Sequence, residues 1–233
     1  MSDVDVIVIG SGAGGLTAAL GCALAGRRVL VIEQHYLPGG WCHSFPLGGY
    51  EYSPGVHYIG DLDNGGLMQR LYEGMGLAQH LTWLELNPDG FDHVLLGDDF
   101  RFDIPKGFEA YQQRLCDRFP HEAAGIRRYL ATVRAVASEL QQNMSAKRSS
   151  FLGSKRLGRL RHAASMPIQT PNLLRWGFRP VSHLMDACVS DPKLKAILAI
   201  QVGGHGLPPS RAPLAMHASV VAHYFDGGFY PKG

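Results

Sequence analysis

Two short apolar runs at the start of the chain enclose a glycine-rich turn and a segment of helical periodicity. Residues 4–9 and 29–32 are rich in β-branched side chains, a composition typical of strands buried in a parallel sheet. Residues 16–25 between them place apolar side chains at helical spacing. This pattern predicts a strand–helix–strand unit in which both strands are buried and parallel.

The remainder of the chain alternates between helical periodicity, one strand pair and turn signals. A short amphipathic helix is predicted where Leu67, Leu71 and Met75 form one stripe. The stretch "FDHVLLGDDFRFDI" (residues 91–104) predicts a β-hairpin with a Gly-Asp-Asp turn. Further helices are predicted over residues 108–144, with a division near Pro120, and over residues 172–202, with a break at Pro180 and a cap at Asp191. A last helix is predicted over residues 210–225, and a turn-rich strand follows it at residues 227–233.

The turn after the first predicted strand has the spacing GxGxxG at Gly10, Gly12 and Gly15. The first glycine permits the tight turn, the second lets the backbone approach a pyrophosphate, and the third lets helix and strand pack closely. The N-terminus of the following helix presents N–H groups and its positive dipole end to the phosphates. Glu33 lies 23 residues after Gly10, where a carboxylate accepts hydrogen bonds from an adenosine ribose. This context favours a nucleotide site over a merely structural turn. The predicted contacts are Gly10, Ser11, Gly12, Ala13, Gly14, Gly15, Glu33 and Gln34.

A second glycine pair, Gly39-Gly40, begins six residues after Glu33. A nicotinamide dehydrogenase has no need of such a turn after its ribose carboxylate. Held close to the first glycine turn, the pair lets an extended dinucleotide continue toward an isoalloxazine ring, so it favours FAD over NAD as the cofactor. The alternative is a simple Pro-Gly-Gly turn that begins at Pro38.

Composition and charge argue against several classes of function. The 233 residues carry a formal net charge of +2 and 45% hydrophobic residues, which suggests neither nucleic-acid binding nor disorder. The four cysteines have no CxxC spacing, as expected of thiols in a reducing compartment, and the eleven histidines match no metal-binding spacing. No signal peptide and no apolar run of about 18 residues is apparent. A cytoplasmic protein is therefore expected, with contact to the inner face of the membrane left open.

One segment departs from this charge balance, because residues 144–166 hold six basic residues and no acidic one. The six are Lys147, Arg148, Lys155, Arg156, Arg159 and Arg161. One interpretation is a solvated loop, and the other is contact with anionic lipid head groups at roughly 1 kcal/mol per cation. Nucleic-acid binding is disfavoured, because no aromatic platform is interleaved with the charges.

Three side chains near the second glycine turn invite chemical hypotheses. His57 and Tyr58 lie in a turn-rich apolar stretch, and Cys42 stands two residues after Gly40. A packed core histidine is the simpler expectation for His57. The same expectation holds for His205, His217 and His223. For Cys42 we expect a small packed side chain, since no partner cysteine makes it a redox disulfide.

Three stretches of the sequence resemble one flavoprotein family. They are "VIEQHYLPGGWCHSF", "GVHYIG" and "PPSRAPLAMHASVVAHYFDGGFYPKG". Together they are similar to the phytoene desaturases, carotenoid isomerases and retinol saturases, over residues 4–61 and 203–233. The glycine turn alone would indicate only the wider superfamily of FAD proteins, whereas the "EQH…GG.CHSF", "HYIG" and "MHA…HY…GGFYP" elements are more specific. The middle of the chain offers no matching motif.

The resemblance implies an α/β fold, a Rossmann-like FAD-binding domain of the glutathione-reductase type with an inserted, largely helical region. Residues 1–60 would form the first part of the FAD domain, residues 61–225 the inserted substrate or membrane-facing region, and residues 226–233 the return toward the FAD domain. Family members continue beyond the GGFYP motif, so the chain is interpreted as an N-terminal portion that lacks a C-terminal half. The GGFYP turn would lie toward the flavin ring, which makes Tyr230 a catalytic candidate beside His57 and Tyr58.

The activity implied by the resemblance is two-electron chemistry, or flavin-assisted isomerisation, on a conjugated isoprenoid such as a retinoid or carotenoid. The flavin would carry the hydride, and the protein would orient the polyene in a dry apolar site. No second GxGxxG follows a strand, so the electron partner stays open between loosely bound NAD(P)H, a reductase, and a quinone or oxygen. Two other interpretations are an FAD-dependent enzyme similar to amine oxidases and a non-catalytic isoprenoid carrier of the same architecture. The full glycine set and Glu33 disfavour the carrier.

Overall fold

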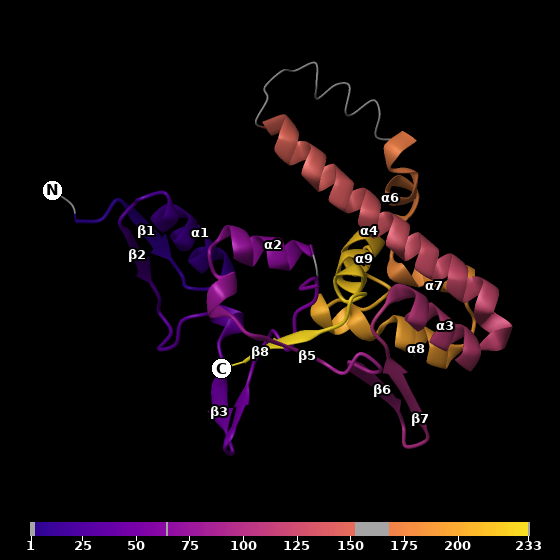
Figure 1. Ribbon diagram of the computed structural model, residues 1–233. Helices are drawn as coiled ribbons and strands as arrows, with labels where there is room; N and C mark the ends of the chain where they lie inside the picture. Colours follow the sequence, from indigo (N-terminus) through magenta and orange to yellow (C-terminus); the bar gives the residue numbers. More distant parts are fainter. Residues whose placement is uncertain (1–2, 64, 152–167, 233) are drawn as a thin grey trace. The chain divides into compact units, whose positions relative to one another are not determined.

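The structure is a computed structural model that describes residues 3–63, 65–151 and 168–232 of the chain (Figure 1). The chain divides into two units. Unit 1 comprises Met1–Glu85 and Gly228–Gly233, and unit 2 comprises Leu86–Gly227. Most of the basic segment singled out in the sequence, from Lys155 to Arg161, lies outside the described residues. The assignment of residues 61–225 to an inserted substrate region stays a prediction.

Unit 1 combines a parallel strand pair with short antiparallel pairs. Its elements are β1 (Val6–Ile9), α1 (Ala13–Leu24), β2 (Val29–Ile32), the 3₁₀ turn η1 (Gly40–Cys42), β3 (Phe45–Leu47), β4 (Tyr50–Tyr52), α2 (Leu67–Gly74), η2 (Ala78–His80), β5 (Trp83–Glu85) and β8 (Phe229–Pro231). β1 pairs with β2 in parallel, from Val6 opposite Val29 to Ile9 opposite Ile32. β3 pairs with β4 and β5 with β8, both in antiparallel fashion. The predicted strand–helix–strand unit, the short helix α2 and the final strand are therefore confirmed.

Gly15 decides how closely α1 packs on β1. A Cβ atom at Gly15 would lie 2.0 Å from the carbonyl oxygen of Gly10 and 3.5 Å from Cγ1 of Val8. Only a hydrogen fits at this distance, so helix and strand meet backbone to backbone. The close helix–strand packing predicted for the third glycine of the turn is thus confirmed.

The opposite face of the β1–β2 sheet is open. Ile7 and Ile9 on β1 are 59% and 87% exposed, and Leu30 and Ile32 on β2 are 44% and 49% exposed. The prediction that both strands are buried is therefore wrong for unit 1. The physical reason is that α1 covers one face of a two-stranded sheet, while alternate side chains of each strand point to the other face (Figure 1).

Unit 2 is built around one long helix, α4. Its elements are β6 (Asp92–Leu96), β7 (Phe100–Ile104), α3 (Phe108–Arg118), η3 (Pro120–Glu122), α4 (Ala123–Phe151), α6 (Pro171–Trp176), α7 (Val181–Cys188), α8 (Pro192–Leu198), η4 (Ile200–Gly204) and α9 (Leu214–His223). α3, α6, α7 and α9 all contact α4 (Figure 1). Ile126, Val133 and Val136 of α4 are 0% exposed and recur at helical spacing. The predicted division near Pro120 is confirmed.

Asp191 caps α8 as the sequence predicts. Its side chain accepts hydrogen bonds from the N–H groups of Lys193 and Leu194, at 2.8 and 3.1 Å. A second carboxylate, Glu122, accepts from the N–H groups of Ser190 and Asp191 at 2.7 and 2.8 Å. These hydrogen bonds connect the residues directly before α8 to the residue directly before α4.

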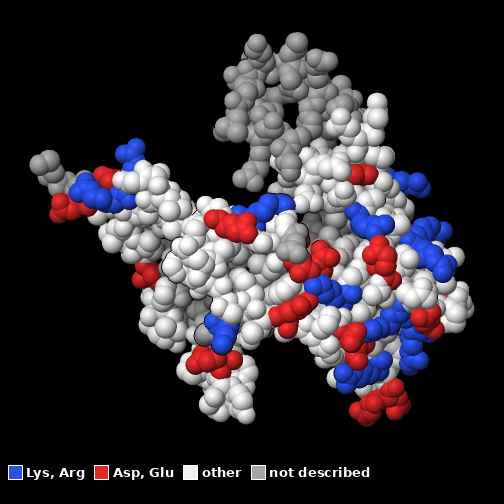
Figure 2. Space-filling view, viewed as in Figure 1, with Lys and Arg blue, Asp and Glu red and all other residues white. Residues whose placement is uncertain are grey.

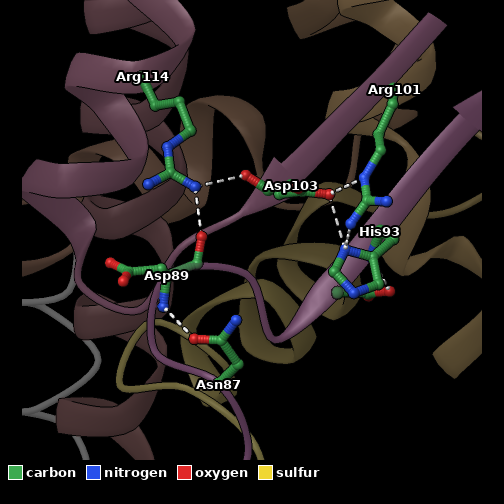
Figure 3. A network of polar contacts seen from close by, with 7 residues as sticks. Asn87, Asp89, His93, Arg101, Asp103 and Arg114 are labelled. Carbon is green, nitrogen blue, oxygen red and sulfur yellow. Dashed lines mark hydrogen bonds and ion pairs between the residues drawn. The ribbon is translucent and has the colours of Figure 1, made fainter.

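A polar network ties the β6–β7 hairpin to α3 (Figure 3). Nδ1 of His93 and Nε of Arg101 lie 2.7 and 2.8 Å from Oδ1 of Asp103. Arg114 of α3 donates to the backbone carbonyls of Asp89 and Asp103, at 2.5 and 3.0 Å. The hydrogen bond from Arg101 holds the pKa of Asp103 below its usual value. The predicted hairpin is confirmed, and side chains fasten it to the neighbouring helix.

Basic and acidic side chains are interspersed over the visible face of unit 2, and much of the visible face of unit 1 is uncharged (Figure 2). Neither sign forms an extended field on that face. This distribution agrees with the formal net charge of +2.

We predict opposite effects for alanine at two adjacent glycines of α1. Gly15→Ala places a Cβ against the Gly10 carbonyl, so it should lower the free energy of unfolding of unit 1 by about 1–3 kcal/mol. Gly14→Ala is the matched control, because a Cβ there meets no atom within 4 Å. Alanine is favoured over glycine inside a helix by up to about 1 kcal/mol. Urea unfolding followed by hydrogen exchange of residues 6–32 measures both variants, and equal stabilities would contradict the packing described above.

Candidate functional site

The glycine turn leaves the N-terminus of α1 open to a ligand. Gly10 has a φ of 92°, and its N–H donates to the carbonyl of Ile32 at 2.7 Å, which joins the ends of the two strands. A Cβ atom at Gly12 would meet no atom within 4 Å, and no side chain caps α1. The N–H groups at Ala13 and Gly14 therefore belong to an uncapped first turn, where the helix dipole favours an anion.

The carboxylate of Glu33 lies beside this turn. Ser11 donates to Oε2 of Glu33 from its N–H and from its hydroxyl, both at 2.6 Å, and the N–H of His35 donates to Oε1 at 2.9 Å. These hydrogen bonds, that of the Ser11 hydroxyl foremost, lower the pKa of Glu33 from 4.5 to about 2. Glu33 is therefore ionised at neutral pH, and its oxygens retain lone pairs for further donors. Gln34 follows with an exposed side chain.

The second glycine turn packs directly on the first. The N–H of Gly39 donates to the carbonyl of Ser11 at 2.9 Å, and Gly39 forms a parallel bridge with Gly12. Gly39 and Gly40 have φ values of 116° and 58°, and a Cβ atom at Gly40 would lie 3.0 Å from Cα of Gly12. A simple Pro-Gly-Gly turn does not require this contact. The pair therefore holds the two turns together by backbone approach.

A cavity of about 360 Å³ adjoins the start of α1 within unit 1. Leu16 and Leu20 of α1 form part of its apolar wall. The three catalytic candidates, His57, Tyr58 and Tyr230, all line it. The structure thus gathers side chains from the two ends of the sequence around one space, and that space begins next to the glycine turn.

Backbone pairing explains how Tyr230 comes beside His57 and Tyr58. Ile59 and Phe229 exchange N–H···O hydrogen bonds at 2.9 and 2.8 Å. β8 also pairs with β5, which fixes the strand that carries Tyr230. These contacts join positions that are remote in sequence, so periodicity alone could not predict them.

Two side chains at this cavity are more exposed than expected. Cys42 and His57 both line the cavity and are both exposed. The expectation of a packed core residue is therefore wrong for each. The reason is local, because Cys42 stands in the 3₁₀ turn η1 and His57 in a segment without regular secondary structure, so neither lies on the buried face of a periodic element.

Sequence reasoning missed the contribution of α2 and the role of Ser11. Tyr72 and Met75 line the cavity, and burial, with Cys42 as a second cause, raises the pKa of Tyr72. The apolar stripe on α2 indicated that one face of this helix is covered, but the sequence does not indicate which part of the protein that face contacts. Ser11 was expected as a ligand contact and not as the hydrogen-bond donor of Glu33.

A histidine pair in unit 2 was also missed. Nε2 of His205 lies 3.2 Å from Nδ1 of His217, which is 0% exposed. Burial, followed by the neighbouring His205, lowers the pKa of His217 to about 4. The expectation of a core histidine is confirmed for His217.

The described ranges offer no metal centre. In residues 3–63, 65–151 and 168–232, no group of three or more His, Cys, Asp or Glu side chains is placed to hold a metal ion. Within the same part of the chain, no helix has both the length and the apolar character needed to cross a membrane.

The chain is similar to known proteins over nearly its whole length. A family model described as "NAD(P)-binding Rossmann-like domain" matches residues 8–74, which include both glycine turns and Glu33. The all-trans-retinol 13,14-reductases of Homo sapiens and Danio rerio are 35% and 32% identical to the chain over 232 and 235 residues. Each alignment covers 99% of this chain, and 37% or 38% of the relative. A prolycopene isomerase of Arabidopsis thaliana is 32% identical over 126 residues, which is 52% of this chain and 20% of that protein.

The retinol reductases extend the resemblance through the middle of the chain, where sequence analysis found no motif. The chain spans less than two fifths of the length of the retinol reductases it matches.

Solved structures share the fold at low sequence identity. A Pyrococcus furiosus protein superposes with a TM-score of 0.58 at 16% identity, covering 98% of this chain and 45% of the other. Putrescine oxidase superposes with a TM-score of 0.53 at 15% identity, covering 98% of this chain and 46% of the other. The predicted Rossmann-like α/β fold is therefore confirmed.

We predict that Glu33 makes the stability of unit 1 depend on acidic pH. A carboxyl whose folded-state pKa is depressed stabilises the fold above its unfolded pKa, and this stabilisation is lost as pH falls toward the folded value. Stability should therefore decline between pH 4.5 and about 2. Glu33→Gln should flatten this decline, whereas Glu51→Gln on β4, an exposed position, should not. Urea unfolding at a series of pH values tests this, and an unchanged slope in Glu33→Gln would contradict it.

Proposed function

We propose that this chain belongs to the family of the all-trans-retinol 13,14-reductases and the prolycopene isomerases, and that the protein is an FAD-dependent oxidoreductase of conjugated isoprenoids. The reaction is the saturation, desaturation or isomerisation of a polyene double bond in a retinoid or carotenoid. The proposal concerns the whole protein, and the 233 residues supply its first dinucleotide-contacting elements.

The contact between the two glycine turns supports FAD as the cofactor. Gly40 approaches Gly12 so closely that a Cβ would lie 3.0 Å from its Cα, and Gly39 donates to Ser11. An NAD site needs only the first turn and the ribose carboxylate. A second turn fixed against the first extends the binding surface in the way a longer flavin dinucleotide requires.

We assign the contacts to the cofactor as follows. The backbone of the first turn and the uncapped N-terminus of α1 would hold the pyrophosphate, and the open space at Gly12 allows its approach. Glu33, flanked by Gln34, would accept hydrogen bonds from the adenosine ribose. The pyrophosphate contacts are Gly10, Ser11, Gly12, Ala13, Gly14 and Gly15, and the second turn adds Gly39 and Gly40.

The cavity beside α1 is proposed as the place where the reacting part of the polyene meets the cofactor. Bound FAD supplies hydride transfer to or from a carbon of the polyene. Leu16 and Leu20 would exclude water from the reacting carbons, and a volume of about 360 Å³ lies in the range of small-molecule sites. When the net reaction is saturation, the neighbouring carbon needs a proton. The hydroxyls of Tyr58 and Tyr230 and the imidazole of His57 are the candidate donors at the cavity wall.

Gly12→Val should abolish FAD retention without unfolding unit 1. Gly12 has φ −66° and ψ 174°, a conformation open to any residue, and its Cβ position is free of protein atoms. The valine side chain would instead occupy the path of the pyrophosphate. The matched control is Gly21→Val, at a second glycine of α1 whose Cβ position is also free. Flavin absorbance after gel filtration measures retention, and stoichiometric FAD in Gly12→Val would overturn the assigned contact.

The FAD-loaded protein should change the absorbance spectrum of a polyene, with its flavin reduced if the reaction is a saturation and with its flavin oxidised if the reaction is a desaturation. Saturation shortens the conjugated system and moves its absorbance to shorter wavelength, whereas isomerisation keeps its length. Incubation with retinol and with carotenoids, with Gly12→Val protein as control, tests the substrate class. NADPH and NADH, added separately in place of a chemical reductant, test whether a nicotinamide is the electron source. Activity on amines alone, with the polyene spectra unchanged, would contradict the proposal.

A further inference from the structure

Two cavities of unit 1 share one wall residue, Tyr72 of α2. The cavity of about 360 Å³ beside α1 is lined on its α2 side by Tyr72 and Met75. We call it the first cavity. A second cavity, of about 210 Å³, is lined in part by Gln69, Tyr72, Glu73 and Trp83. Among the residues that the structure describes, Tyr72 is the one that lines both cavities.

The period of the α-helix explains why Tyr72 lies between the two cavities. Successive residues of an α-helix are turned by about 100° around its axis, so positions three apart differ by about 60°. Gln69 therefore lies about 60° from Tyr72 on one side, and Met75 lies about 60° from it on the other. Gln69 lines the second cavity and Met75 lines the first. Tyr72 thus stands on the boundary between two faces of α2.

The end of α2 fixes the backbone of Tyr72. Gly76 has a φ of 70°, and its N–H donates to the carbonyl of Glu73 at 3.0 Å. The N–H of Leu77 donates to the carbonyl of Tyr72 at 2.8 Å. These two hydrogen bonds form a Schellman motif, in which the residue after the glycine packs on the residue five positions before it. Leu77 and Tyr72 accordingly both line the first cavity.

A ring contact restrains the side chain of Tyr72 from the second cavity. The ring centroids of Tyr72 and Trp83 lie 5.5 Å apart, and the ring planes are inclined by 37°. Trp83 belongs to β5, which pairs with β8, so the sheet fixes its position. Burial raises the pKa of Tyr72, so its hydroxyl stays protonated at neutral pH. An uncharged ring in this position is suited to form a wall.

The two cavities differ in chemical character. Leu16 and Leu20 of α1 contribute apolar side chains to the first cavity. In the second cavity, Nε2 of Gln69 donates to Oε1 of Glu73 at 2.9 Å. A chain that filled the first cavity and passed Tyr72 would therefore bring its far end to an amide and a carboxylate, which suit a hydroxyl group.

We propose that Tyr72 is a specificity-determining residue, because its ring closes the first cavity toward the second and limits the length of the apolar molecule that unit 1 admits. This inference rests on the proposed function, in which the first cavity receives a conjugated isoprenoid. A molecule that fits within the first cavity ends at the ring. With a smaller side chain at this position the two spaces join, and a longer molecule reaches Gln69 and Glu73.

Primary alkanols of increasing length, from hexanol to dodecanol, test this limit in the 233-residue chain. Each methylene buried in an apolar cavity should strengthen binding about fourfold until the chain fills the space. In the wild type we expect this increase to stop at a limiting length. In ¹⁵N spectra the amide resonance of Met75 should shift during the titration, whereas the indole N–H of Trp83 should not.

Tyr72→Leu should extend the limit, because it removes the ring and keeps an apolar residue that favours a helix. Binding should continue to strengthen over about two further methylenes, which is about fifteenfold in affinity. The Trp83 indole should then shift with the longer alkanols. Tyr72→Phe keeps the ring and should keep the wild-type limit. Tyr50→Leu on β4, at a 71% exposed tyrosine that lines neither of these cavities, is the matched control and should also keep it.

Three results would overturn the proposal: an unchanged limit in Tyr72→Leu, a response of Trp83 already present in the wild type, or no alkanol binding at Met75. Alkanols need no flavin and carry no conjugated double bond, so these results do not depend on the polyene reaction. Unchanged polyene spectra together with an extended limit in Tyr72→Leu would refute the proposed function and leave the role of Tyr72 standing.

Discussion

The arrangement of unit 1 depends on two backbone approaches that only glycine permits. At Gly15 the helix α1 meets the Gly10 carbonyl, with 2.0 Å between that oxygen and the position of a Cβ. At Gly40 the second turn meets Gly12 in the same manner. Together these approaches bring the uncapped N-terminus of α1 and both glycine turns close to one another. The hydrogen bonds that Ser11 donates hold the Glu33 carboxylate beside them. The chemistry proposed for this site follows from that proximity.

The same unit leaves a large apolar area in contact with water. Isoleucines of β1 and β2 are exposed because a two-stranded sheet with one helix can cover only one of its faces. Doubly wound dinucleotide-binding folds cover both faces of a wider sheet. In relatives of which this chain spans about 37%, we expect further chain to lie against this face. Unit 2 differs, because its side chains close around α4 and form a continuous core.

Local signals in the sequence were enough to predict most of the elements. Asp191 before Pro192, the interruption at Pro120 and the alternation in β7 each predicted a feature that the structure confirms. The glycine spacing predicted the roles of Gly10 and Gly15 because those roles are set by backbone geometry. Exposure was predicted less well, since burial of a strand depends on what covers it. The cavity could not be predicted, because the pairing of Ile59 with Phe229 joins residues remote in sequence.

The central claim is that the two glycine turns and Glu33 form one dinucleotide site. Titration of the ¹⁵N-labelled chain with ADP, followed through backbone amide resonances, tests it most directly because ADP is the part of FAD that these residues would contact. The account predicts saturable shifts at Ser11, Gly12, Ala13 and Gly39, with the resonances of unit 2 unaffected. Unchanged resonances at the glycine turns, or shifts confined to unit 2, would contradict it.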